Sequence, residues 1–195
     1  PMLPEAAVAS MPCILWLSVI GIVYGALVAL AQSDMKRLIA YSSVSHLGFC
    51  MLGLFALNKL GVEGGALQMI NHGLSTGGLF AIIGMLYERY HTREISKLGG
   101  LARRLPWLAF FMLIFTFSSI GLPGLNGFVG EFLIFKGVFP LAMCSASLSV
   151  IGLLVTAIFI LTILQRVFNG PLNEKWSKFP DLTPGEIGLL LIPIA

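Results

Sequence analysis

Five long apolar segments constrain this chain more than any other feature. Each is long enough to cross the hydrocarbon core of a bilayer as a helix, which takes about 20 residues. They cover residues 12–32, 38–57, 64–87, 105–140 and 145–165, and a sixth apolar stretch begins at residue 187. Every backbone polar group in lipid must be paired within the protein, so helices are expected. The sequence therefore predicts an all-α, polytopic transmembrane bundle that forms a single domain over residues 1–195.

Composition supports a membrane protein and excludes several other classes. Hydrophobic residues make up 57% of the chain and charged residues 11%, whereas soluble domains contain about 25% charged residues. The net charge of +3 is small and dispersed, which argues against a nucleic-acid surface. The three cysteines are isolated and lack metal or cluster spacing, and no nucleotide loop or hydrolase motif is present. Because the chain opens on Pro1 and stops early in its sixth segment, we expect a piece of a longer subunit.

Basic residues are distributed unevenly between the turns, and this bias predicts the orientation of the bundle. Alternate turns hold ten of the twelve basic residues, namely Lys36, Arg37, Arg89, Arg93, Lys97, Arg103, Arg104, Arg166, Lys175 and Lys178. We expect these turns to face the cytoplasm of a bacterium, or the matrix if the chain is mitochondrial.

The segment 105–140 is too long to be one straight transmembrane helix. It would measure about 54 Å, against a hydrocarbon core of about 30 Å. Its middle contains residues that end helices or allow turns. The predicted break consists of Gly121, Pro123, Gly124, Asn126 and Gly127. Non-helical backbone at membrane depth needs polar partners, so the break is expected to face the interior of the bundle.

Glu131 follows the break, and we expect it within about the first turn of the second half-helix. The positive end of that helix would favour a carboxylate by about 0.3–1 kcal/mol. Acids inside a membrane are costly, so a function such as carrying protons is the better hypothesis. The alternative is a structural carboxylate that caps the half-helix. Lys136 is better explained as a side chain that reaches the membrane surface.

Two apolar helices each carry one histidine flanked by hydroxyl or amide groups. The polar faces consist of Ser42, Ser43 and His46 in one helix and Gln68, His72, Ser75 and Thr76 in the next. Histidine can relay protons through either ring nitrogen. The same side chains could instead stabilise helix packing by hydrogen bonds. Lys36 either anchors the interface or leads protons into the path.

Three stretches carry a resemblance to a known family. They are "SDMKRLIAYSSVSHLGF", "MINHGLSTGGLFAIIGMLYERYHTREISKLGGL" and "GLPGLNGFVGEF". The chain resembles the antiporter-like membrane subunits of respiratory complex I, and subunit M (the NADH dehydrogenase subunit 4 family) in particular. The resemblance implies fourteen helices with two inverted five-helix repeats, each containing a broken helix. This chain would supply the second repeat and the start of the last helix.

The resemblance also implies roles for single residues. Glu131, His72, His46 and Lys36 match the family's proton path, and glutamate at 131 is typical of subunit M rather than of the L and N types. NADH, FMN, iron–sulfur clusters and quinone would belong to other subunits, and this chain would hold no cofactor. Its partners would be the L- and N-type subunits in a bacterial or mitochondrial inner membrane, without nucleic acid.

Two other functions remain open at this point. One is a subunit of an Mrp-type cation/proton antiporter or of a membrane-bound hydrogenase. The other is an assembly scaffold that transports nothing, in which the polar residues only pack helices together.

Overall fold

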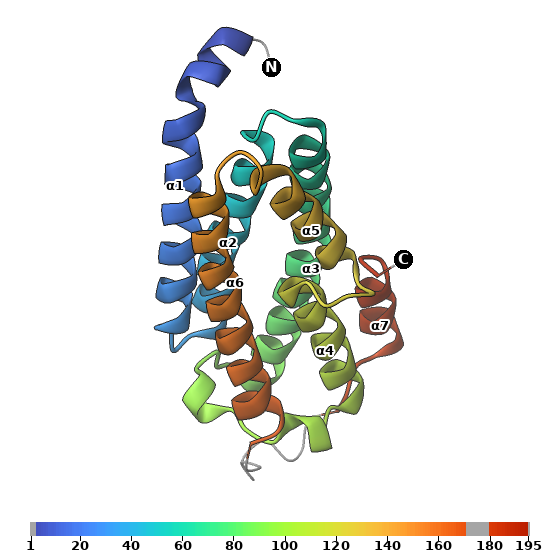
Figure 1. Ribbon diagram of the computed structural model, residues 1–195. Coiled ribbons are helices and arrows are strands. Elements are labelled where there is room, and N and C mark those ends of the chain that lie inside the picture. Colours follow the sequence, from blue (N-terminus) through green and yellow to red (C-terminus); the bar gives the residue numbers. More distant parts are fainter. Residues whose placement is uncertain (1–2, 171–179, 195) are drawn as a thin grey trace.

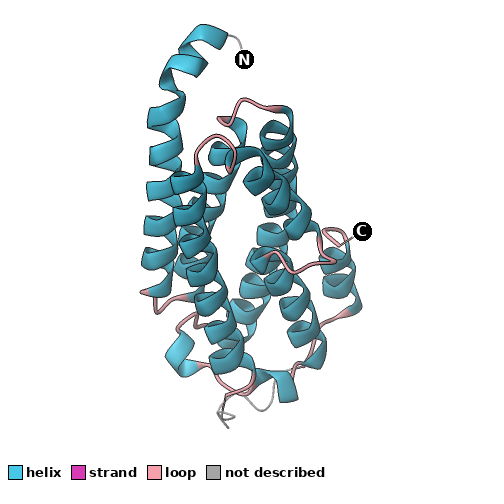
Figure 2. Ribbon diagram, viewed as in Figure 1, coloured by secondary structure: helices cyan, strands magenta, loops and turns pink. Residues whose placement is uncertain are grey.

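The computed structural model describes residues 3–170 and 180–194, which form a bundle of helices without a strand (Figures 1 and 2). The α-helices are α1 (Pro4–Leu30), α2 (Met35–Leu54), α3 (Lys59–Tyr90), α4 (Pro106–Ile120), α5 (Asn126–Val138), α6 (Met143–Ile163) and α7 (Pro184–Leu191). Shorter helices are η1 (Ile95–Lys97), η2 (Leu101–Arg103) and the π-helical turn η3 (Leu164–Phe168). The predicted all-α bundle with a discontinuous helix is confirmed.

Three described helices are long and apolar enough to cross a membrane, judged by length and composition. They are α1, α3, and α6 continued through η3 to Phe168. The predicted segment 38–57 corresponds to α2, which has polar side chains in its middle. The predicted segment 105–140 is divided between α4 and α5, and Figure 1 shows the break about halfway along the bundle. Neither half is long enough to cross a bilayer by itself, so the two together take the place of one membrane-spanning helix.

The turn between α1 and α2 and the loop between α3 and α4 lie at the same end of the bundle (Figure 1). The backbone N–H of Met35 donates to the carbonyl of Arg93 at 3.0 Å, and that of Ile95 donates to the carbonyl of Ser33 at 3.0 Å. The Arg93 side chain also pairs with Asp34 at 3.7 Å. These contacts join two of the turns that are rich in basic residues. Two further basic residues of the predicted set, Lys175 and Lys178, lie outside the described residues.

Helices α1 and α2 approach each other closely through glycines. A Cβ atom on Gly25 would lie 2.8 Å from the backbone nitrogen of Ser45, and one on Gly48 would lie 3.0 Å from the carbonyl oxygen of Ser18. The Ser45 hydroxyl uses this proximity to donate to the carbonyl of Ile22 at 2.9 Å. Small residues that let two backbones come together are typical of helix packing in membranes.

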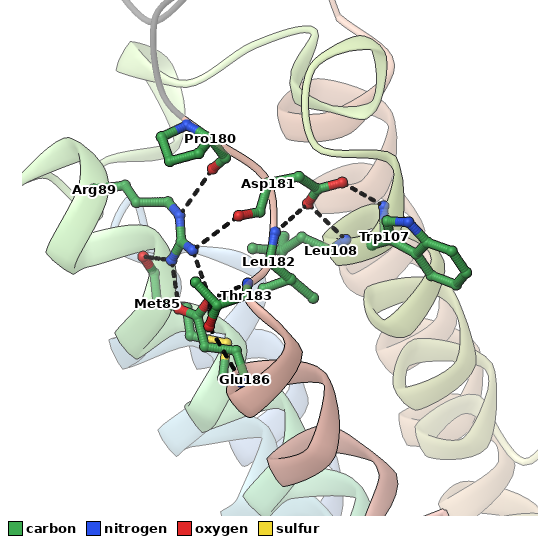
Figure 3. A network of polar contacts seen from close by, with 9 residues as sticks. All are labelled: Met85, Arg89, Trp107, Leu108, Pro180, Asp181, Leu182, Thr183 and Glu186. Atoms are coloured by element: carbon green, nitrogen blue, oxygen red, sulfur yellow. Dashed lines mark hydrogen bonds and ion pairs between the residues drawn. The ribbon is translucent and has the colours of Figure 1, made fainter.

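Arg89, near the end of α3, holds the segment that leads into α7 (Figure 3). Its Nη1 and Nη2 donate to the two carboxylate oxygens of Glu186 at 2.8 and 2.7 Å. Its Nε and Nη2 also donate to the backbone carbonyls of Pro180 and Asp181 at 3.2 and 3.3 Å. Because a planar guanidinium bonds both carboxylate oxygens, the pKa of the Glu186 carboxyl falls to about 2.

Asp181 caps α4, whose own flanking residue Leu105 provides no side-chain cap. The Asp181 carboxylate accepts from the backbone N–H of Trp107 at 2.9 Å and of Leu108 at 3.4 Å. The first amides of a helix lack partners within it, and the helix dipole favours an anion there. We call Arg89, Asp181 and Glu186 the Arg89 clamp, because together they join the end of α3, the start of α4 and α7.

The substitution Gly25→Ala should destabilise the bundle. Its Cβ would meet a backbone atom that cannot rotate away, and overpacking of this kind costs about 1–3 kcal/mol. The melting temperature of the full-length subunit in detergent should fall. The matched control is Gly21→Ala on the same helix, where an added Cβ meets nothing within 4 Å. Equal melting temperatures for the two variants would contradict the packing described here.

Replacing Glu186 with glutamine should weaken the Arg89 clamp in a pH-dependent way. The native pKa of Glu186 is about 2, against an ordinary value of 4.5. The stabilisation is therefore fully present above pH 4.5 and is lost as the pH falls toward 2. The wild type should melt above Glu186→Gln at pH 7, and this difference should shrink below pH 4.5. The exposed Glu63 offers a control, because Glu63→Gln should change the melting temperature little. A difference in melting temperature between the wild type and Glu186→Gln that does not vary with pH would refute the clamp.

Candidate functional site

A layer of buried polar side chains separates two apolar clusters inside the bundle. Along α2, Ile39 belongs to one cluster and Phe49 to the other, and Ser42, Ser45 and His46 lie between them. The other helices contribute buried polar groups as well. Among them are Gln68, Asn71, Ser75, Thr116, Ser118, Ser119, Glu131, Ser149 and Thr156. Polar groups are expensive to bury unless they are paired, so this layer is the candidate functional site.

The break between α4 and α5 begins with a glycine cap. Gly121 has φ 75°, a left-handed conformation that favours glycine, and the N–H of Leu122 donates back to the carbonyl of Phe117 at 3.1 Å. Asn126 and Gly127 were expected in the break but are the first two residues of α5. Glu131 therefore lies in the second turn of α5 rather than the first. The helix dipole acts more weakly on the second turn than on the first.

The middle of the break does not face the interior, contrary to the sequence-based expectation. Leu122, Pro123 and Gly124 are exposed on the described chain. Part of the reason is that this loop pairs two of its donors locally and lacks a third. The N–H of Leu122 is used in the α4 cap, Pro123 has no N–H, and the N–H of Leu125 donates to the carbonyl of Leu122 at 3.1 Å.

The start of α5 is tied to α3 and α4 by a connected set of polar contacts. Asn71 donates from Nδ2 to the backbone carbonyl of Asn126 at 2.7 Å. The Asn126 side-chain oxygen accepts from the Ser118 hydroxyl and from the N–H of Gly127. Ser75 and Ser118 share a hydrogen bond at 2.9 Å. These contacts fix where α5 begins, and therefore where Glu131 lies.

Glu131 is buried in the polar layer, with 5% of its surface exposed. Its Oε1 accepts from Nε2 of Gln68 at 3.3 Å and lies 3.9 Å from Nδ1 of His46. Its Oε2 occupies the space that a side chain on Gly121 would fill. Gly121 thus has two roles. It allows the left-handed turn, and it makes room for the Glu131 carboxylate.

The two predicted histidines lie side by side. The ring centroids of His46 and His72 are 5.0 Å apart, and His46 is 3% exposed. Within residues 3–170 and 180–194, neither ring nitrogen of His46 has a hydrogen-bond partner. His72 pairs with the Thr76 hydroxyl at 3.1 Å through Nδ1. Helices α5, α2 and α3 thus supply three titratable groups in a row: Glu131, His46 and His72.

Ser42 and Ser43 share a helix with His46 but do not bond to it. Both hydroxyls donate to the carbonyl of Ile39 on their own helix, at 2.8 and 3.1 Å. Hydroxyl groups in helices commonly bond backwards in this way. These serines therefore satisfy their own hydroxyl groups within α2 and do not link the titratable groups.

The structure does not bring Lys36 to this site. Lys36 is exposed at the start of α2, and the step of ten positions from it to His46 corresponds to about 15 Å along a helix. Lys136 is also exposed, at the far end of α5. In the described part of the chain, no group of three histidine, cysteine or acidic residues lies close enough to hold a metal ion.

Sequence reasoning did not identify Asn71 as part of the site, nor the pairing of Gln68 with Glu131. A signal for Asn71 was present. Gln68, Asn71 and Ser75 have spacings of three and four residues, which place them on one face of α3. That face is the one that contacts α5.

Comparisons with known proteins agree with this architecture. Residues 1–160 match the family described as "NADH:quinone oxidoreductase/Mrp antiporter, TM". The chain is 45% identical over 191 residues to NADH-quinone oxidoreductase subunit M of Pseudomonas aeruginosa, which covers 98% of this chain and 37% of that protein. It is 44% identical over 188 residues to the subunit M of Rickettsia bellii, covering 96% of this chain and 38% of that protein.

A solved structure has the same fold. A chain in the structure of respiratory complex I from Thermus thermophilus with bound NADH superimposes with a TM-score of 0.92 at 38% identity, covering 98% of this chain and 40% of that chain. The present chain thus spans about two fifths of the length of the proteins that it matches. It belongs to the family of membrane subunits shared by NADH:quinone oxidoreductase and Mrp antiporters.

Proposed function

We propose that this chain is part of a proton-translocating membrane subunit of NADH:quinone oxidoreductase, the subunit M type. The proton carriers are Glu131, His46 and His72, with Lys36 as the residue that leads into the path from the surface. The observation that carries this proposal is the row of three titratable groups beside the interrupted helix, in which Glu131 and His46 are buried and His72 is half-buried. Acids and histidines buried in membrane bundles most often mark ion paths.

The distances support proton exchange with small movements. His46 lies 3.9 Å from the Glu131 carboxylate, slightly beyond hydrogen-bond length, so a water molecule or a modest side-chain rotation would complete the link. The unpaired ring nitrogens of His46 are free to accept and donate on opposite sides. His72, next in the row, carries the path to α3.

The redox chemistry of such a complex belongs, on this proposal, to other subunits that bind NADH, FMN, iron–sulfur clusters and quinone. This chain would contribute no catalytic site of its own. Its partners would be the L- and N-type membrane subunits, and its location a bacterial inner membrane. Moving one proton against 100 mV costs about 2.3 kcal/mol, so the proton affinities of the carriers must alternate during turnover.

An Mrp-type cation/proton antiporter subunit is the second candidate, because the family model includes both kinds of protein. Glutamate at position 131 favours the first candidate, since the resemblance to subunit M includes this residue. Sodium-dependent proton exchange without NADH, measured in vesicles that contain the full-length subunit and its partners, would favour the antiporter.

Replacing Glu131 with glutamine in the full-length subunit of the assembled complex should abolish proton pumping. The amide keeps the shape but cannot carry a proton, so the transport rate should fall by about a hundredfold or more. Pumping driven by NADH oxidation is measured in proteoliposomes with a pH-sensitive dye. Glu63→Gln, in an exposed position at the start of α3, should pump normally.

Assembly must be measured in parallel, because loss of the complex would also abolish pumping. An assembled Glu131→Gln complex that pumps at the wild-type rate would contradict the proposed function and favour a scaffold.

A further inference from the structure

Gln68 of α3 is a buried amide that uses only part of its hydrogen-bonding capacity. It is 3% exposed, and its Nε2 donates to Oε1 of Glu131 at 3.3 Å. Its own carbonyl oxygen has no hydrogen-bond partner in the described part of the chain. A buried carbonyl left unpaired loses its hydrogen bond to water without a replacement. Because this acceptor lies directly beside an acid, it is available to accept a hydrogen bond when the acid becomes protonated.

Two glycines hold Gln68 and Glu131 side by side. A Cβ atom on Gly130 would collide with Oε1 of Gln68 and lie 3.1 Å from its Cβ. A Cβ atom on Gly121 would collide with Oε2 of Glu131. The space for both side chains therefore exists because the break and the first turns of α5 carry glycine at these two positions.

The chemistry of the pair depends on the protonation state of the acid. An ionised carboxylate only accepts hydrogen bonds, whereas a neutral carboxylic acid also has one O–H donor. The amide of Gln68 can serve both forms. Its NH₂ group donates to the carboxylate, and once the amide has turned over, its carbonyl accepts the O–H of the neutral acid.

We propose that Gln68 is a positioning residue that exchanges its hydrogen bond with Glu131 according to the protonation state of Glu131. This inference rests on the proposed function, since Glu131 must take up and release a proton. Among the described residues, the titratable groups near Glu131 are His46 and Cys50 of α2, and His72 of α3 follows His46 in the row. When a protonated His46 passes its proton to Glu131, the N–H bond at Nδ1 breaks, one O–H bond forms on Glu131, the imidazole becomes neutral, and no other covalent bond changes.

The consequence for the path is geometric. Because Gln68 offers a partner to both forms, the Glu131 carboxyl group keeps its place beside His46 before and after it is protonated. Without the amide, the neutral acid would be free to turn away and break the row of carriers.

Infrared difference spectroscopy of the assembled complex, with the full-length subunit, tests this directly. The C=O band of neutral Glu131 is identified by its loss in Glu131→Gln. In Gln68→Met, which keeps side-chain length but removes the amide, this band should move to higher wavenumber because the acid loses its acceptor. Proton pumping should fall about tenfold, the factor that corresponds to one hydrogen bond of about 1.4 kcal/mol.

Gly130→Ala provides a second variant that leaves both functional groups intact. The added Cβ displaces the Gln68 amide, so the same shift of the band is expected. The matched control is Asn58→Ala. It removes another amide hydrogen bond, from Nδ2 of Asn58, the residue that caps α3, to the carbonyl of Gly137 in α5 at 2.7 Å, without touching Glu131. The band should not move in this control.

An unshifted band in both Gln68→Met and Gly130→Ala would overturn the inference, as would an equal shift in Asn58→Ala. If Gln68→Met fails to assemble, Gly130→Ala decides the question. The complete absence of a Glu131 band from the wild-type complex would contradict the proposed function itself. An unshifted band in the variants would leave that function standing.

Discussion

A carboxylate and an interrupted backbone inside an apolar bundle must both find polar partners within the protein, and the rest of this structure depends on that requirement. The hydrocarbon of a bilayer cannot solvate them. Gln68 and His46 lie beside Glu131, and Asn71 and Ser118 hold the start of α5. Both requirements are thus met by side chains of neighbouring helices in the same buried polar layer.

The position of this layer depends on features that lie away from it. Glycines let α1 approach α2, the helix that carries His46, closely. At the far end of α3, Arg89 holds the segment that caps α4 through Asp181. Helix α3 thus contacts both halves of the interrupted helix, one through the polar layer and the other through the Arg89 clamp.

The proposed proton path uses three titratable carriers and one group that cannot titrate. Histidine and glutamic acid accept and release protons, whereas an amide such as Gln68 keeps a carrier in place. The chain spans about two fifths of the proteins that it matches. Under the proposed function, the three carriers would be one section of a proton path.

Hydropathy and helix-breaking residues act locally, so the sequence alone determined the all-α bundle, the break after Ile120 and the presence of buried acid and imidazole. It could not place Asn126 and Gly127 inside α5, because the start of that helix depends on contacts of Asn126 with α3 and α4. The pairing of Gln68 with Glu131, the proximity of His46 and His72 and the remoteness of Lys36 were decided only by the tertiary structure. Those relations depend on how each helix is rotated against helices that are far away in the chain, and side-chain packing sets that rotation.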